Sequence, residues 1–237
     1  MRGKLIVFEG GEGCGKTTQL QRLYDWIVQN KSWQLLLSKG HVAGVKMTRE
    51  PGGTVLGKQL RQLLLNESKL NEPRSANDAL TPVTNKAELL LYAADRAQHV
   101  EEVLLPWLEA GYWVLCDRYI DSTVAYQGYG RQLDLSLITT LNQIATAGLR
   151  GDLTLWLNVP PEVGLDRMRA RGQADRIEQA SMAFHQRVHD GFAMLAKENA
   201  TTVSVAGDRT ADEVAMSIQQ VLQRRLKQWY PEWATSQ

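Results

Sequence analysis

Cysteine is scarce in this chain, because Cys14 and Cys116 are the only two among 237 residues. Two cysteines cannot build the disulfide framework that stabilises small secreted domains, so we expect both thiols to be reduced in a cytosolic protein. The four histidines lack the spacing that is typical of metal ligands, and we expect them to be structural or exposed.

The sequence also lacks long apolar runs and an excess of charge of either sign. No apolar run approaches the roughly 18 residues that a membrane-spanning helix needs, and a core strand beginning at Leu5 leaves no room for a cleavable signal. The 27 basic and 26 acidic residues nearly cancel, so no overall field attracts nucleic acid or an acidic membrane. We therefore expect a cytoplasmic globular protein that binds neither nucleic acid nor membrane.

The segment KLIVFEGGEGCGKTT, residues 4–18, predicts a nucleotide-binding site. Its apolar run at residues 5–8 is typical of a parallel strand buried on both faces, and residues 10–17 match G-x-x-x-x-G-K-[ST] in full. Glycines let such a loop turn its N–H groups onto phosphate oxygens, at the start of a helix expected over residues 18–30. A glycine-rich turn without a ligand is the alternative, but chance rarely supplies the strand and the helix as well.

Three side chains near this loop have expected roles in binding ATP and Mg²⁺. Lys16 can reach the β- and γ-phosphates, and the Thr17 hydroxyl can ligate Mg²⁺. Asp117 ends the apolar run YWVLC and could hold Mg²⁺ directly or through water, or could instead cap a helix. The residues expected around the ATP phosphates are Gly10, Gly11, Glu12, Gly13, Cys14, Gly15, Lys16, Thr17, Thr18, Arg167 and Arg171.

The remaining pattern predicts an α/β fold. Strand-like segments occur at residues 5–8, 45–48, 112–116, 153–159 and 202–205. Helices are expected at residues 18–30, 56–65, 84–110, 133–147 and 211–227, and a further helix after the fourth strand leads into Arg167. The polar stretch 66–85 is expected to be an exposed loop. This alternation is typical of a three-layer fold, with a five-stranded parallel sheet between helices, and we expect a single domain over residues 1–237.

Arginines follow several of the predicted strands, where ligands of such a sheet gather. Arg49 and Arg118 suit a second phosphate group, that of a phosphorylated acceptor. The sequence RMRARG at residues 167–172 puts three guanidinium groups into five residues. On a helix Arg167 and Arg171 would share a face while Arg169 points elsewhere, and phosphoryl transfer needs such dispersed positive charge. We interpret residues 167–178 as a closing lid, and a solvated charged face is the alternative.

These motifs resemble those of thymidylate kinases of the bacterial type with a basic lid, over nearly the whole chain. The matching segments are FEGGEGCGKTT, TREPGGT with Gly57 and Arg61 following, LLLYAADR, DRYIDSTVAYQGYGR and RARGQADRIEQ. The resemblance implies a P-loop NTPase fold like that of nucleoside monophosphate kinases, and Mg²⁺-dependent transfer of the γ-phosphoryl group of ATP to thymidine 5′-monophosphate (dTMP). The product would be dTDP, for dTTP biosynthesis, and the enzyme would be a homodimer.

The resemblance also implies roles for individual residues. Glu12 would approach the deoxyribose 3′-hydroxyl, Tyr92 would stack on thymine, and Arg96 would reach an oxygen of the base. Phenylalanine is commoner than tyrosine at position 92. Arg171 would neutralise the transferring phosphoryl group, because this phosphate loop has no basic residue between Gly10 and Gly15. The expected dTMP site is Glu12, Arg49, Arg61, Tyr92, Arg96, Arg118, Thr123 and Gln127, and the expected catalytic residues are Lys16, Arg171, Glu12 and Arg118.

A GTPase switch and a motor ATPase are the alternative classes of function for a chain with a phosphate loop. A GTPase switch would ordinarily carry Asn-Lys-x-Asp to read guanine, which this sequence lacks. A motor ATPase would release free phosphate without an acceptor, whereas this chain places its arginines to hold a second small anion. A kinase for another nucleotide is the closer rival, and only a comparison of acceptors separates it from a thymidylate kinase.

Overall fold

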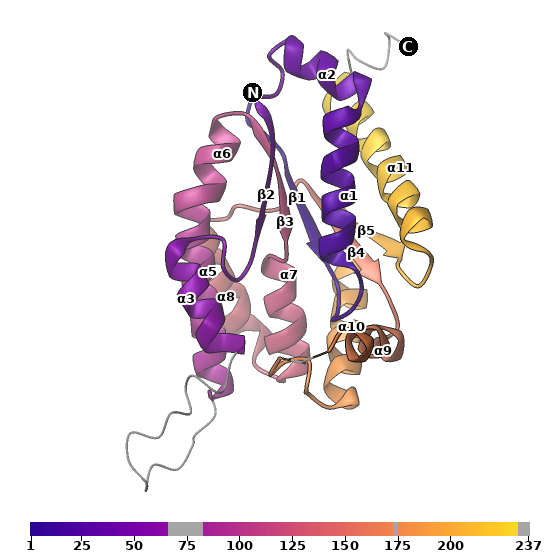
Figure 1. The fold of residues 1–237 in the computed structure, drawn as a ribbon. Coiled ribbons are helices and arrows are strands. Elements are labelled where there is room, and N and C mark those ends of the chain that lie inside the picture. Colours follow the sequence, from indigo (N-terminus) through magenta and orange to yellow (C-terminus); the bar gives the residue numbers. More distant parts are fainter. Residues whose placement is uncertain (66–82, 173–174, 232–237) are drawn as a thin grey trace, which may run out of the picture.

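The computed structural model describes residues 1–65, 83–172 and 175–231, apart from the side chain of Arg171. Five parallel strands form one sheet in the order β2-β3-β1-β4-β5 (Figure 1). The strands are β1 (Leu5–Glu9), β2 (Gly44–Arg49), β3 (Tyr112–Asp117), β4 (Leu153–Asn158) and β5 (Thr202–Ala206). Each lies within one residue of its predicted ends, and the predicted α/β class is confirmed.

The central strand, β1, is buried along its whole length, as its unbroken apolar run predicts. Ile6 and Phe8 belong to the core on the side of α1 (Lys16–Gln29) and α11 (Ala211–Trp229). Leu5 and Val7 point to the opposite face, where they join the core below α6 (Leu105–Glu109). The sheet therefore lies between two helical layers (Figure 1).

The strand register brings the functional ends of three strands together. Asp117 of β3 pairs with Phe8 of β1 on one side and with Arg49 of β2 on the other. Because the strands are parallel, the loops that follow Glu9, Arg49 and Asp117 leave the same edge of the sheet. This edge carries the phosphate loop.

The helix predicted over residues 84–110 is present but is not a regular α-helix throughout. It comprises α5 (Asn85–His99), a wider π-helical segment η1 (Val100–Leu104) and then α6. Pro106 cannot donate a backbone hydrogen bond, and the wider turn just before it accommodates the ring. The predicted loop 66–85 lies largely outside the described residues, and its last residue begins α5.

The other helices include three segments that the sequence analysis does not predict. These are α2 (Lys31–Ser38), the continuous pair α7 (Ile120–Thr123) and η2 (Val124–Gly130), and α10 (Met182–Glu198). The remaining helices are α3 (Val55–Leu65), α8 (Leu135–Thr146) and α9 (Pro161–Arg171). Each helix in the described part of the chain is too short or too polar to cross a bilayer.

Candidate active site

The phosphate loop joins β1 to α1 and closes on the Lys16 side chain. Its backbone has positive φ at Gly10, Gly13 and Gly15, a conformation that glycine adopts most readily. A Cβ atom on Gly13 would also lie 2.0 Å from the carbonyl oxygen of Gly164, so no side chain fits there. Lys16 Nζ donates to the carbonyl oxygens of Gly10 (3.0 Å) and Gly11 (2.8 Å), which fixes the loop around the ammonium group.

The first turn of α1 is open toward this loop. Gly15 caps the helix and provides no side-chain acceptor for the first N–H groups. These donors and the helix dipole favour an anion at the N-terminus. They border an open cleft. Its lining includes Glu12, Gly13, Cys14, Gly15, Lys16, Thr17, Thr18, Arg49, Arg61, Asp117, Arg118 and Arg167.

Thr17 and Asp117 form a pair of oxygen ligands suited to Mg²⁺. The Thr17 hydroxyl donates to Asp117 Oδ2 at 3.0 Å, while the buried Asp117 Oδ1 has no partner among the described residues. Hydroxyl and carboxylate oxygens are ligands that Mg²⁺ prefers, and such sites use few protein ligands. The alternative role for Asp117 is not observed, because α7 starts at Ile120 and its capping residue is Tyr119.

Arg118 connects the phosphate loop to the segment after β3. Its backbone has φ of 71°, which is unusual for a residue other than glycine. Its Nη1 donates to the Gly10 carbonyl oxygen at 3.0 Å and its Nη2 to Glu12 Oε1 at 2.5 Å. Burial alone would raise the pKa of Glu12, but Arg118 and Lys16 outweigh it and lower the pKa to about 2. Glu12 is therefore ionised at neutral pH.

A second cavity adjoins the phosphate cleft and shares part of its wall. Its lining includes Glu12, Arg61, Tyr92, Arg96, Arg118, Thr123 and Gln127. Seven of the eight residues expected around dTMP thus border one cavity. The eighth, Arg49, lies in the phosphate cleft at the end of β2. The residues that border both spaces are Glu12, Glu50, Arg61, Arg118 and Asp175.

Tyr92 and Gln127 approach this second cavity from different elements. Tyr92 projects from the middle of α5, and burial raises the pKa of its phenol, which stays protonated. Gln127 belongs to η2, and its Nε2 donates to Glu88 Oε1 at 2.8 Å. This bond fixes the orientation of the amide beside the cavity.

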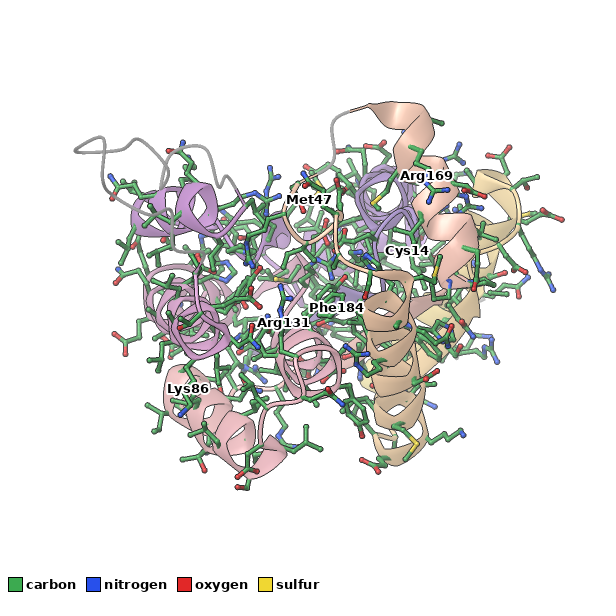
Figure 2. The ribbon with its side chains drawn as sticks, turned by 90° about the horizontal axis from the view of Figure 1, so that it is seen from below. Cys14, Met47, Lys86, Arg131, Arg169 and Phe184 are labelled. Atoms are coloured by element: carbon green, nitrogen blue, oxygen red, sulfur yellow. The ribbon has the colours of Figure 1, made fainter. Side chains whose placement is uncertain are left out.

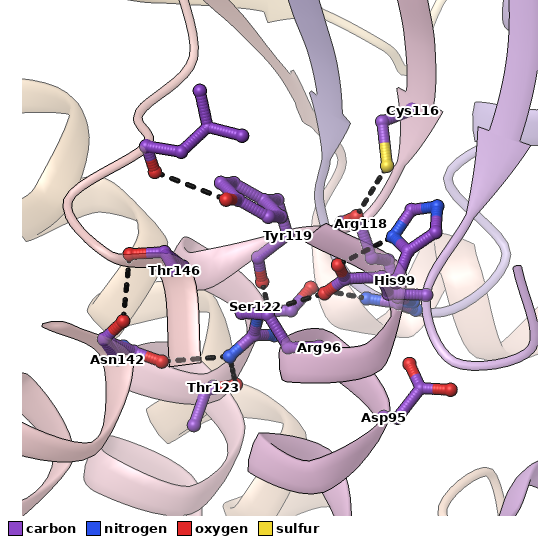
Figure 3. A network of polar contacts seen from close by, with 12 residues as sticks. Asp95, Arg96, His99, Cys116, Arg118, Tyr119, Ser122, Thr123, Asn142 and Thr146 are labelled. Carbon is purple, nitrogen blue, oxygen red and sulfur yellow. Dashed lines mark hydrogen bonds and ion pairs between the residues drawn. The ribbon is translucent and has the colours of Figure 1, made fainter. Parts of the chain in front are cut away.

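Arg96 is the centre of a buried network (Figure 3). Its Nε donates to Glu50 Oε2 at 2.8 Å, and its Nη2 donates to the Tyr119 carbonyl oxygen at 3.0 Å. Its Nη1 donates to Thr123 Oγ1 (2.8 Å) and Asn142 Oδ1 (2.7 Å). These four bonds use four of the five guanidinium N–H groups, which leaves one Nη2 hydrogen for a ligand in the cavity.

Replacing Arg96 by Met should strongly destabilise the fold. The change leaves the carboxylate of Glu50, which is 3% exposed, without its positive partner. Removing one partner of a buried ion pair typically lowers the free energy of unfolding by about 3–5 kcal/mol, so the midpoint of thermal unfolding should fall by roughly 10 °C. Arg169→Met is the matched control, since Arg169 is an exposed residue on α9. Equal unfolding temperatures for the two variants would contradict the structural role of Arg96.

The predicted lid is described only in part. Arg167 on α9 lines the phosphate cleft and donates to the Gly207 carbonyl oxygen at 3.1 Å. Arg169, also on α9 (Figure 2), is exposed and pairs with Asp166. The side chain of Arg171 and residues 173–174 lie outside the described part of the chain. After them, Asp175 borders both cavities.

Two further residues, Glu88 and Tyr126, were not expected from the sequence. Glu88 is fully buried and binds Gln127, Arg131 and Arg176, so it joins the cavity wall to the segment after α9. Tyr126 donates its hydroxyl hydrogen to Glu12 Oε1 at 2.6 Å. The spacing of four residues on one helix could have placed Glu88 one turn before Tyr92. The residues that bind Glu88 and Tyr126 lie far away along the sequence, so no local pattern could have predicted these contacts.

Comparison with known proteins identifies the family. The thymidylate kinase family model matches residues 8–218. A thymidylate kinase of Nostoc punctiforme is 53% identical, over 96% of this chain and 99% of that protein. A thymidylate kinase of Acaryochloris marina is 50% identical, over 98% and 100%, and one of Carboxydothermus hydrogenoformans is 45% identical, over 94% and 98%. The chain therefore belongs to the thymidylate kinase family, whose members are phosphotransferases that convert dTMP to dTDP with ATP.

Proposed function

We propose that this chain performs the family reaction by holding ATP in the phosphate cleft and dTMP in the adjoining cavity. The observation that carries this assignment is that the two spaces share one wall, in which Arg61 and Arg118 lie together with the carboxyl groups of Glu12, Glu50 and Asp175. Two cationic side chains at the junction suit the point where the acceptor phosphate meets the γ-phosphate. Phosphoryl transfer depends mainly on such positioning and charge stabilisation.

On the donor side, the N–H groups of the loop and of the first turn of α1 bind the phosphates of ATP. Lys16 then shifts its hydrogen bonds from the Gly10 and Gly11 carbonyl oxygens to the phosphates. Thr17 and Asp117 would hold Mg²⁺, directly or through water. When bound, the ion neutralises charge on the β- and γ-phosphates.

On the acceptor side, Arg49, Arg61 and Arg118 bind the phosphate of dTMP. Glu12, ionised and held by Arg118, accepts a hydrogen bond from the 3′-hydroxyl. The base stacks on Tyr92, and the remaining Nη2 hydrogen of Arg96 donates to an oxygen of thymine. Thr123 and Gln127 complete the pocket around the base and the sugar.

The choice of acceptor tests this assignment. We expect kcat/KM to be highest for dTMP and modestly lower for dUMP, because one methyl group in an apolar pocket is worth roughly 1–3 kcal/mol. It should be very low for dCMP, because Arg96 cannot accept a hydrogen bond from an exocyclic amine. Equal kcat/KM for the three nucleotides would overturn the assignment of the base pocket, and a preference for another nucleotide would overturn the substrate.

Arg171→Ala should lower kcat far more than it weakens the binding of either nucleotide. Arg171 ends α9, the helix that borders the phosphate cleft through Arg167. A lid arginine meets charge mainly in the transition state, where such a group can be worth on the order of 10³-fold. Steady-state kinetics should show this loss, while Arg169→Ala, two residues earlier on the same helix, should retain the wild-type kcat. If only ATP affinity falls, Arg171 is a binding residue and another arginine serves the transition state.

We further propose that the chain works as a single P-loop kinase domain, as a homodimer in the cytoplasm. Exposed apolar side chains on α3 (Val55, Leu56 and Leu63) and on α5 (Leu90) offer a surface for helix packing between two copies. Sedimentation should give about twice the chain mass of 26.6 kDa. A monomer at micromolar concentration would rule out this surface as a stable interface.

A further inference from the structure

We propose that Glu9 is a positioning residue for phosphoryl transfer, acting through Ser122 on the guanidinium group of Arg118. This inference rests on the proposed function, in which Arg118 binds the acceptor phosphate. Glu9 lies outside the lining of both cavities, as far as the described residues define them. Any effect of Glu9 on dTMP must therefore be transmitted by another residue.

Glu9 is the last residue of β1, fully buried just before the phosphate loop. Its Oε1 accepts hydrogen bonds from the backbone N–H groups of Tyr119 (2.8 Å) and Ser122 (3.1 Å). Its Oε2 accepts the hydroxyl hydrogen of Ser122 at 2.6 Å. One carboxylate thus holds three donors, and all of them belong to the short segment that follows Arg118.

Ser122 passes this constraint to Arg118. Because the Ser122 hydroxyl hydrogen is directed to Glu9, its oxygen lone pairs are free to accept, and Arg118 Nη1 donates to that oxygen at 3.2 Å. Figure 3 shows Ser122 and Arg118 in the same polar network. The same Nη1 also donates to the Gly10 carbonyl oxygen, and Nη2 donates to Glu12, so Ser122 adds a contact from outside the phosphate loop.

The backbone provides a second link from Glu9 to Arg118. Arg118 adopts φ of 71°, which costs free energy for a residue with a side chain. The N–H of the next residue, Tyr119, donates to Glu9, and the N–H of Arg118 donates to the Phe8 carbonyl oxygen at 2.9 Å. Both bonds tie this turn to the end of β1.

A buried carboxyl group is costly unless its hydrogen bonds compensate. Burial, and then the nearby Asp121, raise the pKa of Glu9, while Ser122, Arg118 and the Tyr119 N–H oppose the rise. The donors that offset the cost of this carboxylate are thus the groups that orient Arg118. Asp121 is the neighbouring buried carboxyl group, and no described residue links it to Arg118 by a hydrogen bond.

Three variants and one double variant test the chain of contacts. Ser122→Ala should lower kcat/KM for dTMP about tenfold, a typical value for one hydrogen bond to a charged group, with KM for ATP within about twofold of wild type. Glu9→Gln should lower it at least as much, because an amide nitrogen at the position of Oε2 cannot accept the Ser122 hydrogen. The double variant should be no worse than Glu9→Gln alone, since both changes break one chain. Glu198→Gln, the control, changes an exposed carboxylate at the end of α10 and should keep the wild-type kcat/KM.

The possible results separate this proposal from the function on which it rests. If the wild-type chain does not phosphorylate dTMP, the proposed function fails. If it does and Ser122→Ala is unchanged, the positioning role of Glu9 fails alone. Losses that multiply in the double variant would show that Glu9 does not act through Ser122. Equal losses for ATP and dTMP with a lower unfolding temperature would show that Glu9 acts only on stability. If Glu9→Gln does not fold, Glu9→Asp takes its place in the same comparison, because it keeps the charge and shortens the side chain that reaches Ser122.

Discussion

Replacing Lys16 by Met should abolish phosphoryl transfer while the protein remains folded. Lys16 is 7% exposed, and its ammonium group forms hydrogen bonds to Gly10, Gly11 and Cys14 of the phosphate loop. Methionine fills a similar volume on the first turn of α1 but carries no charge to meet the phosphates. Removing a preorganised charge from such a site typically costs 10²–10³ in kcat, and about 10³-fold or more is expected here.

Lys31→Met provides the control, because Lys31 is also the first residue of a helix but is exposed on α2. Turnover should be measured with saturating ATP and dTMP, together with thermal unfolding of both variants. Near wild-type turnover for Lys16→Met with an unchanged unfolding temperature would contradict the assigned role of Lys16.

Arg118→Lys should lower kcat/KM for dTMP by about 10²–10³-fold, although the charge is kept. The Arg118 guanidinium group contacts Gly10, Glu12 and Ser122 at once and borders both cavities. A lysine ammonium group is a point charge that cannot reproduce this fork. The second reason is geometric. The acceptor phosphate must meet the γ-phosphate in line, and a small displacement of the acceptor lowers the rate of transfer strongly.

The kinetic parameters for each substrate separate these effects. Arg118→Lys should raise KM for dTMP and lower kcat, while KM for ATP changes little. A rise in KM for ATP alone would place Arg118 on the donor side. The matched control is Arg131→Lys, since Arg131 binds Glu88 behind the cavity wall and lies outside the expected nucleotide contacts.

The strands and the phosphate loop could be predicted because their signals are local. The apolar run of β1 and the glycines after it determine a buried strand and a tight loop within a few residues. The helix α10 also has a local signal, with Phe184, Val188 and Phe192 at spacings of four after the capping Ser181, and reading that spacing would have found it.

The partners of Arg96 could not be predicted, because they come from three other segments. Glu50, Thr123 and Asn142 are 46, 27 and 46 residues away from it along the chain. The resemblance implies that Arg96 forms a hydrogen bond to the base. In the structure, four of its five guanidinium N–H groups donate to other residues of the protein. Likewise, only the position of α7 resolved whether Asp117 caps a helix.

The most direct test of the account is to follow all products of ATP in the presence of Mg²⁺, with and without dTMP. If the two cavities hold donor and acceptor as proposed, ADP and dTDP should appear in equal amounts, with little free phosphate, and ATP should be stable when dTMP is left out. Release of free phosphate at the same rate with and without dTMP, and no dTDP, would contradict the account and indicate an ATPase.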